Sequence, residues 1–169
     1  MKNIKIFLST LLILILIYGC ALLVSIYIIP TIRIYDDSMN PSLSKDDIMI
    51  YKKTKNIKEG DIVIFSIDDK ILIKRCIAVA NDTVNIDEDG NLYINDIKYE
   101  EEYIKNKSYG KVSIDFPFKI SNDSIFVLSD DRTDPSDSRN SLIGEVNNSQ
   151  IIGKIVYRIY PIKKLGKVY

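Results

Sequence analysis

The N-terminal apolar run is the feature that most constrains this chain. From Phe7 to Ile29 almost every residue is apolar and none is charged. A helix of this length spans the ~30 Å hydrocarbon core of a bilayer. The run therefore predicts that residues 1–30 form a short N-terminus and a transmembrane anchor, and that residues 31–169 form one modest domain.

The charges that flank this run predict its orientation. Lys2 and Lys5 precede it, and the first charge after it is Arg33. Basic flanks tend to stay in the cytoplasm, so we expect a single-pass protein of the cell membrane whose N-terminus is cytoplasmic and whose domain beyond Pro30 is extracytoplasmic. A cleaved secretory signal would have a shorter apolar stretch and a small-residue cleavage site. The residues before Cys20 faintly resemble a lipoprotein processing site, but the apolar run continues past them.

The composition excludes several kinds of chemistry. The chain has no histidine, which rules out Ser-His-Asp and Cys-His catalysis and every zinc site that needs imidazole. Basic and acidic residues both number 23, so no basic nucleic-acid surface is indicated. Cys20 and Cys76 are too few for a disulfide framework. We therefore expect no cofactor, no metal and no nucleic-acid partner, and a hydrolase built from this chain needs a proton acceptor other than histidine.

Beyond the anchor the pattern is typical of strands, with short runs of Ile, Val, Phe and Tyr bounded by Gly, Asn, Asp and Pro. The predicted strands are Thr31–Tyr35, Asp47–Tyr51, Asp61–Ser66, Ile71–Ala80, Thr83–Ile86, Leu92–Ile97, Ile125–Leu128 and Ile151–Tyr160. Asp89-Gly90 indicates a hairpin. A calcium loop is the alternative there, but it would need glycine where Leu92 stands. The domain is therefore predicted to be a mainly β fold with antiparallel sheets, of Greek-key or barrel-like type.

Two residues could supply hydrolytic chemistry without histidine. Lys74 interrupts an apolar run, and burial of a lysine lowers its pKa toward the range of a useful base. The alternative is an edge-strand lysine that extends to water. Ser38 follows a predicted strand within Asp37–Leu43, where a serine in an Asn-Pro turn is the ordinary interpretation.

The segment around Ser38 resembles the nucleophile box of the type I signal peptidases, in which Ser-Met-x-Pro is followed by Thr or Ser and then Leu. Three further segments resemble boxes of that family in the same order, and the match continues nearly to the C-terminus. They are residues 60–65, residues 74–78 with the lysine, and residues 129–139. The chain is therefore identified as a member of the Gram-positive, single-anchor type, with the β fold that this family shares with the SOS repressors.

The resemblance implies an activity and roles for particular residues. The family is a group of membrane-bound serine endopeptidases that remove N-terminal signal peptides from exported preproteins, at sites of Ala-x-Ala type. Ser38 would be the nucleophile that forms an acyl-enzyme, and Lys74 would be its general base. The backbone N–H of Ser38 would be one oxyanion donor. The implied partners are preprotein signal peptides, the lipid bilayer and the secretion machinery.

The same resemblance assigns substrate-binding and supporting residues. Ile32 and Ile34 would line the substrate groove, Met39 and Leu43 would complete a shallow S1 pocket, and Ile73 would lie in the S3 pocket. The supporting residues would be Arg75, Asp130, Arg132, Ser136, Asp137, Ser138 and Arg139. Of these, Asp137 and Arg139 are expected to cluster with Arg75 and hold the lysine strand. Ordinary core packing and a solvated loop are the alternatives.

The chain departs from the family pattern at two positions that bear on catalysis. Asp36 stands where the family has Ser or Gly, and an ionised carboxylate cannot donate to an oxyanion. The hydroxyl that orients the lysine in the family aligns with Pro135, and Ser136 is the nearest hydroxyl that could replace it.

Two other classes fit part of this pattern. Self-cleaving SOS repressors share the β fold and the serine–lysine chemistry, but they are cytoplasmic and lack a membrane anchor. The other is a dedicated or non-catalytic signal-peptidase homologue that assists assembly of pilins or other surface proteins. A non-catalytic homologue predicts loss of the dyad, and both of its members are present.

Overall fold

The computed structural model describes the backbone of residues 2–168 and their side chains except those of 2–3 and 24–28. The chain divides into two units, Met1–Pro30 and Thr31–Tyr169. The first consists of helix α1, Lys2–Ile28. The stretch Ile4–Leu23 is long and apolar enough to cross a membrane. The helix ends two residues before Pro30, because proline cannot continue a helix and restricts the residue before it.

The second unit is built from antiparallel strands, as predicted. Its larger sheet has the order β1-β2-β11-β3-β4-β9-β10, and β12 pairs with β11. These strands are β1 Thr31–Arg33, β2 Ile48–Lys52, β3 Ile62–Ile67, β4 Lys70–Ala78, β9 Ser124–Leu128, β10 Val146–Asn147, β11 Ile151–Tyr160 and β12 Gly166–Lys167. A 3₁₀ turn, Ile162–Lys164, precedes β12. It was not predicted.

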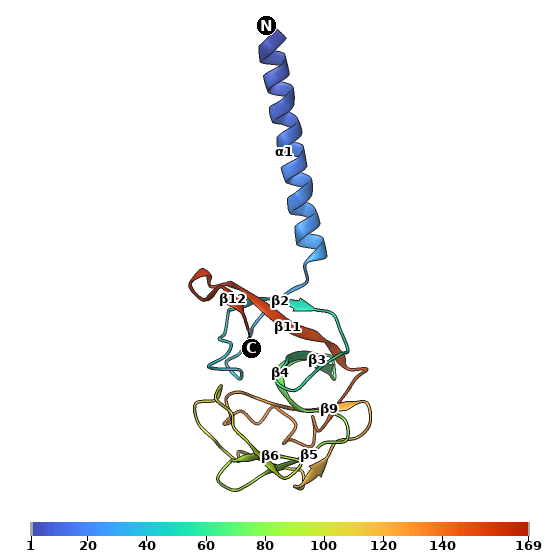
Figure 1. The fold of residues 1–169 in the computed structure, drawn as a ribbon, viewed down its shortest axis with the longest axis vertical. Coiled ribbons are helices and arrows are strands. Elements are labelled where there is room, and N and C mark those ends of the chain that lie inside the picture. The colour runs from blue at the N-terminus through green and yellow to red at the C-terminus, as the bar shows by residue number, and fades with distance from the viewer. Residues whose placement is uncertain (1, 169) are drawn as a thin grey trace. The chain divides into compact units, whose positions relative to one another are not determined.

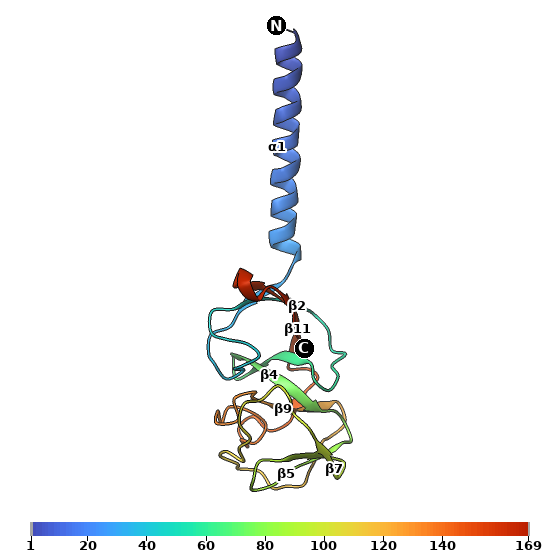
Figure 2. The same cartoon turned by 60° about the vertical axis from the view of Figure 1, so that its left-hand side comes forward.

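A smaller sheet has the order β7-β6-β5-β8. Its strands are β5 Thr83–Ile86, β6 Leu92–Ile94, β7 Ile97–Tyr99 and β8 Phe118–Lys119. In Figures 1 and 2, β9 lies between this sheet and β2. The hairpin at Gly90 is confirmed, with Gly90 at φ +78°. The single strand predicted over Leu92–Ile97 is wrong, because Asn95 and Asp96 adopt positive φ and turn the chain back into β7.

Among the described residues, three apolar clusters form the core, and β3 contributes to two of them. Ile62 and Ile64 pack with Met39 and Leu43 in one cluster. Val63 and Phe65 point to the other face and pack in a second cluster. This alternation is the period of two expected for a strand that is buried on both faces. Because β3 is the neighbour of β4, its burial fixes the strand that carries Lys74.

Candidate active site

Lys74 is held inside the larger sheet by the β3–β4 pair. It lies opposite Val63 of β3. Its neighbours Leu72 and Cys76 on β4 both pack in the cluster around Phe65. The Lys74 side chain is only 2% exposed. The prediction that this lysine is buried rather than extended to water is therefore confirmed.

Several charges act on the Lys74 ammonium. Burial has the largest effect and lowers the pKa of Lys74, because desolvation disfavours the charged form. The carboxylates of Asp134, Asp137 and Asp36 oppose that shift, and the Arg139 guanidinium adds to it. The net pKa of Lys74 lies below its ordinary value. A larger fraction of this lysine is therefore neutral at a given pH than of an exposed lysine, as a general base requires.

Ser38 lies just beyond β1, and its backbone is fixed to a distant loop. The side chain is buried, and the Ser38 carbonyl accepts the N–H of Asp131 at 2.9 Å. Asn40 N–H donates to the Asp37 carbonyl at 2.9 Å and closes a turn around the serine. These bonds hold the nucleophile candidate between the end of β1 and the loop that follows β9.

Asp36 binds Ser38, and its charge also acts on Lys74. The Ser38 N–H donates to Asp36 Oδ1 at 3.0 Å. Although burial raises the pKa of Asp36, bonds from the Ser38 side chain and amide, together with the Lys74 charge, lower it overall. Asp36 is thus ionised and engages the amide that is the expected oxyanion donor.

A buried charge network lies on the other side of β4. Arg75 binds both oxygens of Asp130, at 2.8 and 2.7 Å, and stacks over the Tyr103 ring at 4.1 Å. Tyr103 donates to Glu101 at 2.7 Å, and Glu101 pairs with the buried Arg132. The segment after β7 therefore braces the strand that carries the lysine.

A second network fixes the loop after β9. Arg139 pairs with Asp137 at 2.7 Å, and both side chains are fully buried. The Ser138 hydroxyl accepts the N–H of Val127 at 2.9 Å. Gly110 has φ +70°, and a Cβ there would lie 2.5 Å from Arg139 Nη1, so the guanidinium requires a glycine at this position. The loop is thus a fixed structure rather than the solvated loop that was the alternative.

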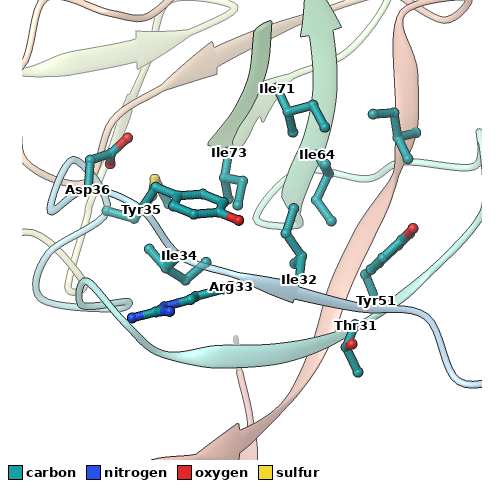
Figure 3. Close-up of a pocket in the computed structure, with 12 residues that line it drawn as sticks. Thr31, Ile32, Arg33, Ile34, Tyr35, Asp36, Tyr51, Ile64, Ile71 and Ile73 are labelled. Atoms are coloured by element: carbon teal, nitrogen blue, oxygen red, sulfur yellow. The ribbon is translucent and has the colours of Figure 1, made fainter. Parts of the chain in front are cut away.

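An apolar cleft of about 310 Å³ is lined by residues of β1 and β4 and by Asp36 and Met39. Figure 3 shows Ile32, Ile71 and Ile73 on its walls, with Asp36 at one end and Tyr51 at the other. Strand β1 forms one side of the cleft, so a bound peptide would lie against its backbone. The cleft therefore suits an extended apolar segment.

Comparisons with known proteins found a matching family and similar proteins. The chain matches the family described as signal peptidase, peptidase S26, over residues 5–160. Signal peptidase I S of Bacillus subtilis is 33% identical over 159 residues, covering 87% of this chain and 85% of that protein. Signal peptidase I of Bacillus licheniformis is 31% identical over 160 residues, with 87% and 85% covered. A crystal structure of a signal peptidase I from Enterococcus faecalis aligns with TM-score 0.49 and 25% identity, covering 59% of this chain and 96% of that one.

The chain belongs to the peptidase S26 family of signal peptidases. Membership confirms the predicted function, removal of signal peptides by a serine protease, and does not favour a non-catalytic assembly factor. The family is membrane-anchored, and α1 supplies an apolar helix that could serve as the anchor.

Two details expected of this signal peptidase are corrected by the structure. Arg75 pairs with Asp130, while Asp137 pairs with Arg139, so the expected cluster of all three is wrong. The two pairs are separate because each arginine already has a carboxylate that binds it through two nitrogens.

The second correction concerns the cleft. Ile32, Ile34, Met39 and Ile73 line it, as expected of substrate-binding residues. Leu43 does not, because it is fully buried in the core cluster with Met49. The pocket wall expected at Leu43 is therefore wrong.

Three residues around the site escaped the sequence analysis. Glu101 and Tyr103 lie in a segment without a family motif, and only the fold brings Tyr103 to Arg75 and Glu101 to Arg132. Asp134 lies within the last box, and its carboxylate is paired with Lys74. The signal that the sequence offered was a carboxylate at position 134, directly before the proline that aligns with the family's lysine-orienting hydroxyl.

Proposed function

We propose that Ser38 is the nucleophile and Lys74 the general base of this signal peptidase. The observation that carries the proposal is the burial of Lys74 in a chain that has no histidine. Asp36 supports it, because one carboxylate binds Ser38 and also interacts with the Lys74 charge. Asp36 also lines the apolar cleft, which supports a site for both residues at that end of it.

In this mechanism the neutral Lys74 amine takes the proton of the Ser38 hydroxyl as its oxygen attacks the scissile carbonyl. The tetrahedral intermediate collapses, and the leaving amine of the mature protein takes the proton from Lys74. An ester then joins the signal peptide to Ser38. Water attacks this ester while Lys74 again removes a proton, and the returned proton frees Ser38. The Ser38 N–H stabilises the oxyanion in both halves once it leaves Asp36 Oδ1.

Replacing either member of the dyad tests this proposal. We expect Ser38→Ala and Lys74→Ala each to abolish cleavage of a preprotein by the purified full chain in detergent, because the two groups act as one unit. Circular dichroism should show that both variants retain the β domain. Substantial cleavage by the folded Lys74→Ala variant would refute the lysine mechanism.

We also propose that α1 anchors the chain with its N-terminus in the cytoplasm and residues 31–169 outside. Lys2 and Lys5 before the apolar run support this orientation. Protease added to intact protoplasts should digest the β domain and leave a protected fragment containing α1. Full protection of the domain until the cells are lysed would contradict the topology.

For substrates, we propose preproteins delivered by the secretion machinery whose signal peptides end in Ala-x-Ala. Ile34, Met39 and Ile73 support this, because they give the cleft apolar walls that suit a small apolar side chain such as alanine. A peptide with alanine before the scissile bond should be cleaved at least ~10-fold faster than one with leucine, a difference typical of pocket discrimination. Equal rates would show that another surface binds this side chain.

A further inference from the structure

The surroundings of Lys74 leave one carboxylate without a role in the proposed mechanism. Asp134 Oδ2 lies 3.9 Å from Lys74 Nζ. The Asp134 side chain is 26% exposed, whereas that of Lys74 is 2% exposed. Asp134 therefore faces the lysine from the solvent-exposed side of the site. It lies directly before Pro135, which stands where the family has the hydroxyl that orients the lysine.

The Asp134 side chain is held in this orientation. Its Oδ1 accepts the N–H of Ser136 at 2.6 Å, which leaves Oδ2 directed at Lys74. Its carbonyl accepts Arg139 Nη2 at 2.9 Å. The following Pro135 further restricts the backbone of Asp134, because proline disfavours the helical region for the residue before it.

We propose that Asp134 is the positioning residue for Lys74, replacing the hydroxyl that Pro135 cannot provide. Ser136 contributes to this arrangement through its backbone N–H, which orients Asp134. The proposal rests on the function proposed above for Ser38 and Lys74.

A carboxylate in this position has a consequence that a hydroxyl would lack. It stabilises the ammonium that forms when Lys74 takes a proton, but it also makes the free enzyme hold that proton to higher pH. Among the charges acting on Lys74, Asp134 has the largest effect, ahead of Asp137, Asp36 and Arg139. Substituting Asp134 should therefore change both the position of the amine and its protonation.

Two substitutions separate these effects. Asp134→Asn removes the charge, and its side-chain oxygen can still accept the Ser136 N–H. Asp134→Ala removes both. The rising limb of the pH–rate profile should move to lower pH by about one unit in both variants, because a nearby opposite charge typically shifts a pKa by one unit or more. Asp134→Ala should also lower the plateau kcat by ~10-fold or more, with little change in KM, since misplaced catalytic groups lose rate rather than binding.

Asp69→Asn is the matched control. It makes the same chemical change at an exposed position of the β3–β4 turn, where asparagine also tolerates the φ of +62°. Its pH profile should coincide with that of the wild type. The shift for Asp134→Asn should also exceed that for Asp36→Asn.

The measurement uses the full chain in detergent and a fluorogenic peptide with Ala-x-Ala before the scissile bond. Shifted limbs for both Asp134 variants, with a lowered plateau in Asp134→Ala alone, would support the proposal. Unshifted limbs in the folded variants would overturn it, even if the plateau fell, because a merely structural role would lower the rate without moving the limb. Ser38→Ala and Lys74→Ala are measured alongside. If those two retain activity, the dyad itself is wrong, whereas loss of activity in both with unchanged Asp134 profiles refutes only the role of Asp134.

Discussion

Lys74 and Arg75 are adjacent on β4, and both are buried, but their surroundings are opposite in kind. Arg75 binds both oxygens of Asp130, at 2.8 and 2.7 Å, and also the Gly60 carbonyl and the Ser42 hydroxyl, at 2.9 and 3.0 Å. The carboxylate paired with Lys74 is 3.9 Å away.

The two pKa values move accordingly. Burial opposes the charge of both side chains. For Arg75 the hydrogen bonds and charge of Asp130 outweigh burial and raise the pKa, whereas for Lys74 burial prevails and lowers it. A well-compensated cation thus stabilises the strand, and an under-compensated one beside it can give up its proton.

The largest effect is expected when the buried Arg75–Asp130 ion pair is broken. Arg75→Met leaves the Asp130 carboxylate, which is 1% exposed, buried without its partner. Removing one partner of a buried ion pair typically costs about 3–5 kcal/mol of unfolding free energy. Urea unfolding of the detergent-solubilised chain, followed by the signal of its tyrosines, should show this loss.

Lys74→Met is the control for that experiment. Methionine has a similar volume, and its thioether needs no compensation, so stability should change by less than about 1.5 kcal/mol or rise. Cleavage should nevertheless be lost. If the two substitutions destabilised the domain equally, the contrast between the two cations would be invalid.

This contrast also indicates what the sequence could reveal. Ser38 and Lys74 could be proposed as the dyad because each lies in a short local motif whose chemistry depends on residue type. The strands were found because the β3 and β4 runs have clear apolar character and turn residues at their ends. These signals are local, so they can be recognised in a single sequence.

The partners of the cations were harder to predict. Arg75 and Asp130 are 55 residues apart, and the partner expected for Arg75 was Asp137, which the fold pairs with Arg139 instead. The ring of Tyr103 comes from a segment with no motif. Pairing across the fold depends on sheet order and loop paths, which the sequence pattern does not determine.

A smaller effect is expected at Asp36, which acts on the under-compensated cation. Asp36 is ionised and raises the pKa of Lys74. Asp36→Gly removes that charge and also frees the Ser38 N–H for the oxyanion. The wild-type activity should rise with pH at a midpoint below the ordinary lysine pKa of about 10.4. In Asp36→Gly this limb should move to lower pH by up to about one unit, which is up to tenfold in rate at a fixed pH on the limb.

The pH–rate profile of both proteins on one peptide substrate checks this expectation. Asp37→Gly serves as the control, since it removes a neighbouring carboxylate whose Oδ1 accepts the N–H of Lys45. A shift of the Asp36→Gly limb to higher pH would refute the coupling between Asp36 and Lys74.

The smallest effect is expected for an ion pair that lies in water. Arg33 donates to Asp46 Oδ1 at 3.1 and 2.8 Å, yet the two side chains are 58% and 54% exposed. An exposed pair is screened by solvent and typically contributes less than about 1 kcal/mol. Arg33→Met, the same substitution as at Arg75, should therefore lower the unfolding free energy by no more than about 0.5 kcal/mol, and the difference should vanish in 1 M salt.

Arg33 is the better partner to change, because Asp46 has φ +72° and its replacement would add backbone strain. A loss for Arg33→Met as large as that for Arg75→Met would mean that burial is not what distinguishes the two pairs.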